Sequence, residues 1–352
     1  MSDAAAEPTD APDATARDLL EELVATPSPS GDEAAAAEVL VEFFEAHDRE
    51  VFLDDVGNVR APADDTVLLT SHVDTVPGDI PVRVEDGEDG RELWGRGSVD
   101  AKGPLAALAV AAVRTGVSFV GVVGEEVNSR GARFLVEDRE APDAVVNGEP
   151  SGWDGVTLGY RGILQGTYVA TSESGHTSRP ENNAIQDAIA WWSRVEAEFE
   201  NDPYEPVFEQ VTAKPVDVEG GTSDDGLSVE ATLNVQLRVP SSMTCDEVRE
   251  IADGHLDGGH VNWNDQVRPT MQSPRNPVGR AFRVAIRGEG GDPRLLRKTG
   301  TSDMNIYAGT WDCPMATYGP GDSDLDHAPD EHLPFGELDR AVAVLEEVAA
   351  DL

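Results

Sequence analysis

The stretch SFVGVVGEEVNSRGA, residues 118–132, joins an apolar run to two adjacent carboxylates. The run from Phe119 to Val123 predicts a buried strand, and Glu125 and Glu126 follow it directly. Like charges at the mouth of an apolar strand repel each other and lose hydration, so a compensating partner is expected. Strict alternation would point the two side chains to opposite faces, so we expect the strand to end by Gly124.

Segments typical of strands and helices alternate on both sides of this stretch. Residues 66–71 predict a strand, 103–114 a buried helix, 132–138 a further helix and 143–148 another strand. Residues 17–47 have helical spacing, broken by a loop in which Ser30 or Asp32 could cap the next helix. The sequence therefore predicts an α/β fold with a mostly parallel sheet covered on both faces.

The pattern changes in the middle of the chain, where antiparallel strands and two helices are expected. The predicted elements are a strand at 162–172, a helix at 183–200, strands within 205–220 and 226–240, and a helix at 244–256. We interpret this part as an inserted α+β sandwich. The predicted organisation is a flexible N-terminus at 1–16, a main domain at 17–161 and 270–352, and an inserted domain at 162–269.

Composition narrows the class of protein. The 352 residues carry a formal net charge of −42, and the lysines are only Lys102, Lys214 and Lys298. This balance is typical of adaptation to high salt, where screening lengths shrink to a few ångströms. No basic stripe could neutralise phosphates, so nucleic acid is an unexpected partner. Cys245 and Cys313 lack disulfide or metal spacing, and no signal peptide or membrane span is recognisable, so we expect a cytoplasmic protein.

Polar side chains follow several of the predicted strands. In an open α/β sheet such groups converge outside the carboxyl ends of the strands. The converging set is His72, Asp74, Asp100, Glu125, Glu126, Glu149 and His327. Imidazole and carboxylate groups suit zinc or a similar divalent ion. Five ligands from this set would be more than one tetrahedral ion can bind. We therefore expect two metals, each with one His and one Glu, bridged by a shared Asp.

Four of these residues have a simpler interpretation beside the functional one. His72 could be a hydrogen-bonded structural histidine, and Asp100 could cap the helix that follows it. Glu149 could be a solvated turn residue, and His327 lies in an acidic segment that could be a solvated loop. Glu331, in the same segment, is interpreted as a solvated charge with no role.

Five motifs together resemble the zinc metallopeptidase family of acetylornithine deacetylase, succinyl-diaminopimelate desuccinylase and carboxypeptidase G. They are SHVDTVPG (71–78), GRGSVDAKGP (95–104), GEEVNSRGA (124–132), NGEPSG (147–152) and GHTSRPENNAI (175–185). They occur in the family's order, and the resemblance covers almost the whole chain after residue 17. It implies a di-zinc catalytic domain with an inserted lid or dimerisation domain, two Zn²⁺ per subunit replaceable by Co²⁺ or Mn²⁺, and a homodimer.

The resemblance also implies a role for each site residue. His72 and Glu149 would bind one zinc, Glu126 and His327 the other, and Asp100 both. Asp74 would orient the His72 imidazole, and Glu125 would be the general base on the bridging water. His176 would reach the partner subunit's active site and stabilise the oxyanion.

Within the family, the stretch KTGTSDMNIYA (298–308) resembles enzymes that release lysine or ornithine from the amino-group carrier protein LysW. The substrate-pocket candidates implied are Arg161, Asn234, Thr301, Ser302, Asp303 and residues Gly319 to Gly321. The carrier is expected to be acidic, and we hypothesise a local basic docking site for it, formed by Arg275, Arg280, Arg283, Arg287, Arg294 and Arg297. The alternatives are acetylornithine deacetylase, succinyl-diaminopimelate desuccinylase or a dipeptidase, and, in another class, a non-catalytic metal-binding assembly protein.

Overall fold

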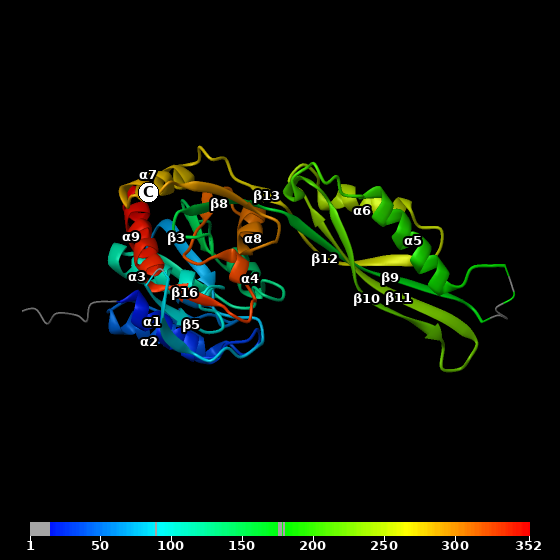
Figure 1. The fold of residues 1–352 in the computed structure, drawn as a ribbon, viewed down its shortest axis with the longest axis horizontal. Coiled ribbons are helices and arrows are strands. Elements are labelled where there is room, and N and C mark those ends of the chain that lie inside the picture. The colour runs from blue at the N-terminus through cyan, green and yellow to red at the C-terminus, as the bar shows by residue number, and fades with distance from the viewer. Residues whose placement is uncertain (1–14, 89, 175–177, 179) are drawn as a thin grey trace, which may run out of the picture. The chain divides into compact units, whose positions relative to one another are not determined.

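The computed structural model describes residues 15–88, 90–174, 178 and 180–352 of the chain. These residues form two compact units (Figure 1). The first holds residues up to 158 with 272–296 and 310–352, and the second holds 159–271 and 297–309. Segment 297–309 thus packs with the second unit, whereas the sequence places it in the main domain. The division into functional domains stays a prediction.

The larger sheet has nine strands, in the order β1-β2-β6-β3-β7-β15-β8-β13 with β14 also paired to β8. They are β1 (Phe52–Leu53), β2 (Val59–Ala61), β3 (Asp64–His72), β6 (Val117–Val122), β7 (Val145–Gly148), β8 (Gly155–Tyr160), β13 (Thr270–Met271), β14 (Arg294–Lys298) and β15 (Met315–Thr317). The central strands β6, β3, β7 and β15 are parallel, and β2 and β8 join them antiparallel. Their carboxyl ends therefore meet at one edge, where ligands bind in such sheets.

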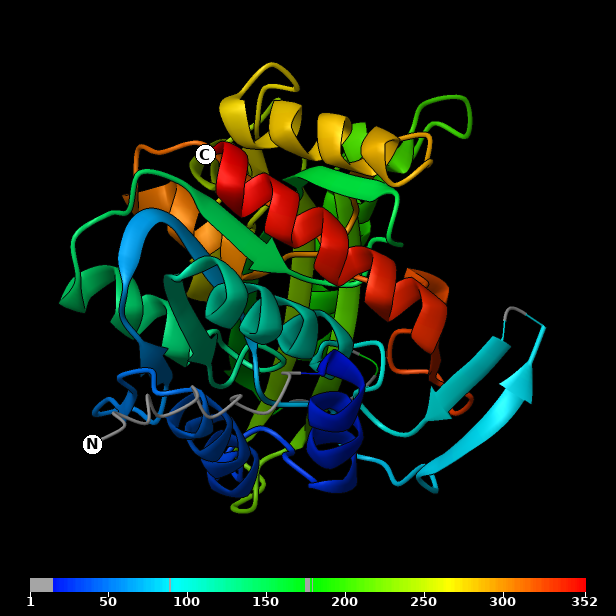
Figure 2. The same cartoon turned by 90° about the vertical axis from the view of Figure 1, so that its left-hand side faces the viewer.

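The helices of the first unit are α1 (Ala16–Ala25), α2 (Ala34–Ala46), α3 (Lys102–Thr115), α4 (Arg130–Asp138), α7 (Pro277–Gly288) and α9 (Phe335–Asp351). A short 3₁₀ turn, η2, spans Ser323–Leu325. The teal helix α3 and the red helix α9 lie side by side over the sheet (Figure 2). Because α3 also packs against α1 and β3, it is buried along most of its length, which explains its Ala- and Leu-rich sequence.

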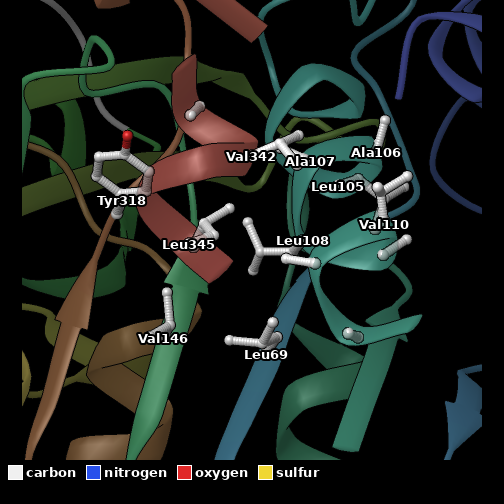
Figure 3. Packing of buried hydrophobic residues seen from close by; sticks show 14 of the residues in the cluster. Leu69, Leu105, Ala106, Ala107, Leu108, Val110, Val146, Tyr318, Val342 and Leu345 are labelled. Atoms are coloured by element: carbon white, nitrogen blue, oxygen red, sulfur yellow. The ribbon is translucent and has the colours of Figure 1, made fainter. Parts of the chain in front are cut away.

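The core between these helices and the sheet fixes the strands that lead to the polar edge. Leu69 of β3 and Val146 of β7 face Leu108 of α3 and Leu345 of α9 (Figure 3). All four side chains are excluded from solvent, which stabilises the fold by roughly 1.5–3 kcal/mol for each large one. The end of β3, which carries His72, is therefore held from both sides.

A small antiparallel sheet brings the C-terminal segment beside the loop after residue 94. It consists of β4 (Arg83–Gly87), β5 (Gly90–Trp94) and β16 (His332–Pro334), in the order β16-β5-β4. His332 pairs with Trp94 in the register, and the two rings stack. This pairing places the residue before β16, Glu331, next to the segment that leads to Asp100.

The second unit is built on a four-stranded antiparallel sheet, in the order β10-β11-β9-β12. Its elements are β9 (Gly162–Glu173), α5 (Ala184–Glu198), η1 (Val207–Glu209), β10 (Thr212–Thr222), β11 (Ser228–Val239), α6 (Cys245–Gly254), β12 (His260–Val267) and α8 (Asp303–Thr310). Helices α5 and α6 cover one face of this sheet, where Tyr168 stacks on Trp191 in the core (Figure 1). These elements match the α+β pattern expected from the sequence.

The sequence predicts neither a disulfide nor a membrane-spanning helix. Cys245 and Cys313 are both free thiols. Among the described residues, none of the helices combines the length and the apolar composition needed to span a bilayer.

Candidate metal centre

The ends of the parallel strands gather the predicted ligands. His72 is the last residue of β3, Glu149 follows β7, and Glu125 and Glu126 lie in a turn after β6. His327 lies in the loop between η2 and β16, in the left-handed region at φ 61°. These residues come from separate segments, and the first unit brings them together at one edge of its sheet.

Two groups of ligand atoms form there, and they share one carboxylate. The first group is His72, Asp100 and Glu149, and the second is Asp100, Glu126 and His327; the ligand atoms within each lie within 4.8 Å of one another. Nε2 of His72 is 3.3 Å from Oδ1 of Asp100, and Nε2 of His327 is 3.1 Å from its Oδ2. Each oxygen of Asp100 therefore faces a different histidine, which is the arrangement of a bridging ligand.

Asp100 does not cap the helix that follows it. The residue before α3 is Ala101, and no side chain caps the first turn. The carboxylate of Asp100 is instead directed at the two histidines, so the prediction that Asp100 caps the helix is wrong. Its role as a metal ligand stays a prediction.

The electrostatics of the cluster show an excess of negative charge. Burial lowers the pKa of His72, but the carboxylates of Asp100 and Asp74 outweigh it, and the pKa lies well above its usual range. Burial, followed by repulsion from Asp100, raises the pKa of Glu126 to about 7. The hydrogen bond that the His327 ring donates to Asp100 raises the pKa of His327 to about 9. A site that holds protons this firmly has a strong field for cations.

The donor set fits divalent metal ions. Histidine nitrogens and carboxylate oxygens are the ligands that zinc and similar ions use, and a shared carboxylate is typical of paired ions. One oxygen of Glu126, Oε1, is buried and has no hydrogen-bond partner among the described residues. Since a buried carboxylate oxygen is costly when unpaired, this atom indicates a ligand position.

The carboxylate of Asp74 accepts several hydrogen bonds beside the candidate ligands. Its Oδ1 accepts the backbone N–H of Glu125 at 3.0 Å, and its Oδ2 accepts that of Glu126 at 3.2 Å and the hydroxyl of Ser30 at 2.7 Å. The ring of His72 contacts both the backbone oxygen of Asp74, at 2.8 Å, and its carboxylate, at 3.6 Å. Ser30 thus supports the site rather than capping α2, whose first turn has no side-chain cap.

The turn after β6 resolves the problem of the adjacent glutamates. The strand ends at Val122, and Gly124 adopts φ 75°, a conformation that side chains rarely tolerate. The chain therefore leaves strand geometry before Glu125, as expected. Glu126 joins the second ligand group, and the carboxylate of Glu125 lies near enough to raise the pKa of His72.

Glu331 corrects the sequence interpretation. The sequence predicts a solvated charge at this position, but the side chain is fully buried. It accepts hydrogen bonds from the backbone of Gly97, Val99 and Asp100 and from the guanidinium of Arg96. Nothing in the local sequence could have indicated this, because the burial arises from the pairing of β16 with β5.

The predicted pocket residues fall in both units. In the second unit Arg161 is buried and donates to the carbonyls of Thr299, Val207 and Gln210. Burial lowers its pKa to about 10. The other candidates there are Asn234, which accepts from Thr167, Thr301, which accepts from Arg238, and the buried Ser302 and Asp303. His176 lies outside the described residues.

Gly319 and Gly321 belong to the first unit, next to a ligand. A Cβ on Gly319 would lie 2.8 Å from the carbonyl oxygen of Glu149, and Gly321 adopts φ 108°. Gly319 therefore has no room for a Cβ, and Gly321 has a backbone conformation that favours glycine. Their contact with substrate stays a prediction, as does that of the candidates in the second unit.

Comparison with known proteins identifies the class. Residues 68–351 match the model of the peptidase family M20/M25/M40, and the chain belongs to this family. The fold is also that of an aminopeptidase, PepT from Bacillus cereus, at 21% identity with a TM-score of 0.76 over 96% of this chain and 97% of that one. A metallo-carboxypeptidase of the family from Sulfolobus solfataricus gives 0.77 at 18% identity, covering 95% and 98%. The predicted family and α/β fold class are confirmed, and the chain is a hydrolase that acts on an amide bond.

Curated relatives are similar over nearly their whole length. A LysW-lysine hydrolase from Deinococcus radiodurans is 40% identical, with 96% of this chain and 97% of the relative covered. A LysW-lysine/LysW-ornithine hydrolase from Sulfurisphaera tokodaii is 29% identical, with 92% and 91% covered. These similarities agree with the subgroup that the sequence motifs indicate.

Proposed function

We propose that this protein hydrolyses the amide that joins lysine or ornithine to the carrier protein LysW. The observation that supports hydrolysis most directly is the pair of ligand groups that share Asp100. The carrier substrate is supported by the relatives named for it, which are up to 40% identical over almost the full chain. A role in lysine or arginine biosynthesis follows from such a product.

The chain's own residues divide the chemistry. Divalent ions bound at these residues would supply Lewis-acid chemistry, which polarises an amide carbonyl and lowers the pKa of water. His72, Glu149, Asp100, Glu126 and His327 would hold them, and Asp74 fixes the ring and the turn that carry two of the ligands. Glu125 takes the proton from the water and delivers it to the leaving amine, so it acts first as base and then as acid.

We propose zinc as the resident metal, with cobalt or manganese as substitutes, and a homodimer as the assembly. His and carboxylate donors are compatible with all three ions. Dimerisation through the second unit is supported by β10, an end strand of its sheet with Val216 and Val218 exposed. Metal analysis and light scattering of the purified protein test these two proposals.

One experiment separates the substrate alternatives. Turnover of LysW-linked lysine, LysW-linked ornithine, N-acetylornithine, succinyl-diaminopimelate and a dipeptide is compared at molar salt. The proposal predicts that a carrier-linked substrate has the highest kcat/KM and that a chelator abolishes its turnover. Preference for a small acyl-amino acid would favour the deacylase alternatives, and no turnover of any substrate by the metal-loaded protein would favour the non-catalytic one.

A further inference from the structure

Glu331 is a buried carboxylate that contacts the backbone of the shared ligand. Oε1 accepts the N–H of Asp100 at 3.0 Å and that of Val99 at 2.9 Å. Oε2 accepts the N–H of Gly97 at 3.1 Å and the guanidinium of Arg96 at 2.8 Å. Each oxygen thus has two donors, and the segment from Arg96 to Asp100 wraps around one side chain.

The same carboxylate joins two ligand-bearing segments. Glu331 lies four residues after His327, and Arg96 also donates to the carbonyl of Ala328, the residue next to that histidine. A further bond runs from the N–H of Gly95 to the backbone oxygen of Glu331, at 3.3 Å. The loop that carries His327 and the loop that carries Asp100 are therefore fastened to each other at this point.

Both ligands depend on such fastening. His327 is more than half exposed and adopts a left-handed backbone conformation that few residues other than glycine favour. Asp100 belongs to both ligand groups, so a small rotation of its backbone would displace donor atoms from both positions. A buried, fully hydrogen-bonded carboxylate is a rigid support, because its removal leaves several donors unsatisfied.

We propose that Glu331 is a positioning residue that holds the Asp100 bridge and the His327 loop in register for binding two metal ions. Glu331 itself belongs to neither ligand group among the described residues. The inference rests on the proposed dinuclear site, and it assigns a cause to the geometry of that site.

The test is Glu331→Gln, measured as metal affinity of the folded protein. Glutamine keeps one acceptor oxygen, but its NH₂ group would face the N–H of Gly97 and the guanidinium of Arg96, which now donate to Oε2. Metal-free protein is titrated with Zn²⁺ or Co²⁺ against a chromophoric chelator, and the visible spectrum of Co²⁺ reports ligand geometry. We expect an affinity loss of about 10- to 100-fold for both ions and an altered cobalt spectrum.

Asp54→Asn is the matched control. Asp54 is also a buried carboxylate, and it accepts from the backbone of Val56 and Asn58 and from the guanidinium of Arg60. None of these residues belongs to the ligand groups. The control should lower thermal stability while leaving metal affinity within about threefold of wild type, as expected for a purely structural role.

The outcomes are distinguishable. Wild-type affinity in Glu331→Gln, or an equal loss in Asp54→Asn, would overturn the inference. A wild-type protein that binds no metal would instead overturn the dinuclear site itself. If Glu331→Gln fails to fold, Arg96→Gln removes one donor near the surface, and an affinity loss of about three- to tenfold is then expected; unchanged affinity in that variant would contradict the inference.

Discussion

Asp74→Asn tests how the site is held, because the substitution keeps the shape of the side chain and removes its charge. The carboxylate accepts three hydrogen bonds, from Ser30 and from the backbone of Glu125 and Glu126, and it is fully buried. An asparagine oxygen can keep the bond from Glu125, and the hydroxyl of Ser30 can turn to accept from the new NH₂ group. The N–H of Glu126 then has no acceptor.

The energetic cost of Asp74→Asn follows from the hydrogen bonds that the asparagine keeps and loses. One bond to a charged acceptor is lost, at about 1.5–3 kcal/mol, and the two that remain are weaker because the acceptor is neutral. We expect the free energy of unfolding to fall by about 3 kcal/mol, a large part of the roughly 5–15 kcal/mol typical of a domain. Since the displaced amide belongs to a ligand, metal affinity should also fall by about 10- to 100-fold.

The assay is urea denaturation of the metal-free protein, with metal titration of the folded protein beside it. Ser30→Ala is the matched control, since it removes one part-buried hydroxyl that donates to the same charged carboxylate and leaves both backbone bonds, so a loss of about 1.5 kcal/mol, at the low end for such a bond, is expected. The reasoning is refuted if Asp74→Asn costs no more than Ser30→Ala, or if it destabilises the protein without changing metal affinity.

Three further predictions concern the proposed base, an ion pair and the docking of the carrier. Glu125→Gln should keep the metal content and lower kcat by about 10²- to 10⁴-fold; near-normal turnover would exclude it as the base. Glu33, held by two hydrogen bonds from Arg130, has a lowered pKa despite burial, so its stabilisation of about 1 kcal/mol is present above the usual glutamate pKa and lost as pH falls through the lowered pKa of the folded state. Glu33→Gln should therefore destabilise the protein at pH 7, by a difference that shrinks as pH falls through that lowered pKa, and a pH-independent difference in unfolding curves would contradict this. Reversing the exposed Arg280 and Arg287 of α7 should raise KM for a carrier-linked substrate only; an equal rise for a small acyl-ornithine would exclude docking there.

Much of the fold followed from local pattern. The helix expected at 103–114 is α3 at Lys102–Thr115, and the strand expected at Phe119–Val123 is β6 at Val117–Val122. These elements are long and apolar, so their own sequence specifies them. The order of strands in the sheet depends on long-range packing, and no local pattern could give it.

The candidate ligands could be predicted from the sequence, whereas the residues that support them could not. His72 and Glu126 lie directly at or after strand ends, where polar side chains are conspicuous. Ser30 and Glu331 lie in polar segments that resemble ordinary loops, and they reach the site only through tertiary contacts 44 and about 230 residues away in the chain. Burial of a charged side chain is a property of the assembled fold, and for this reason Glu331 was missed.

The shared carboxylate is the central claim, and counting bound metal tests it most directly. Wild type, His327→Ala and Asp100→Ala are dialysed against Zn²⁺ under identical conditions, and the ions per folded chain are measured. At low free zinc we predict two ions per chain for wild type, one for His327→Ala and none for Asp100→Ala. The reason is that Asp100 is the one described residue shared by both groups. Two ions retained by Asp100→Ala, or a single ion in wild type, would contradict a bridged pair.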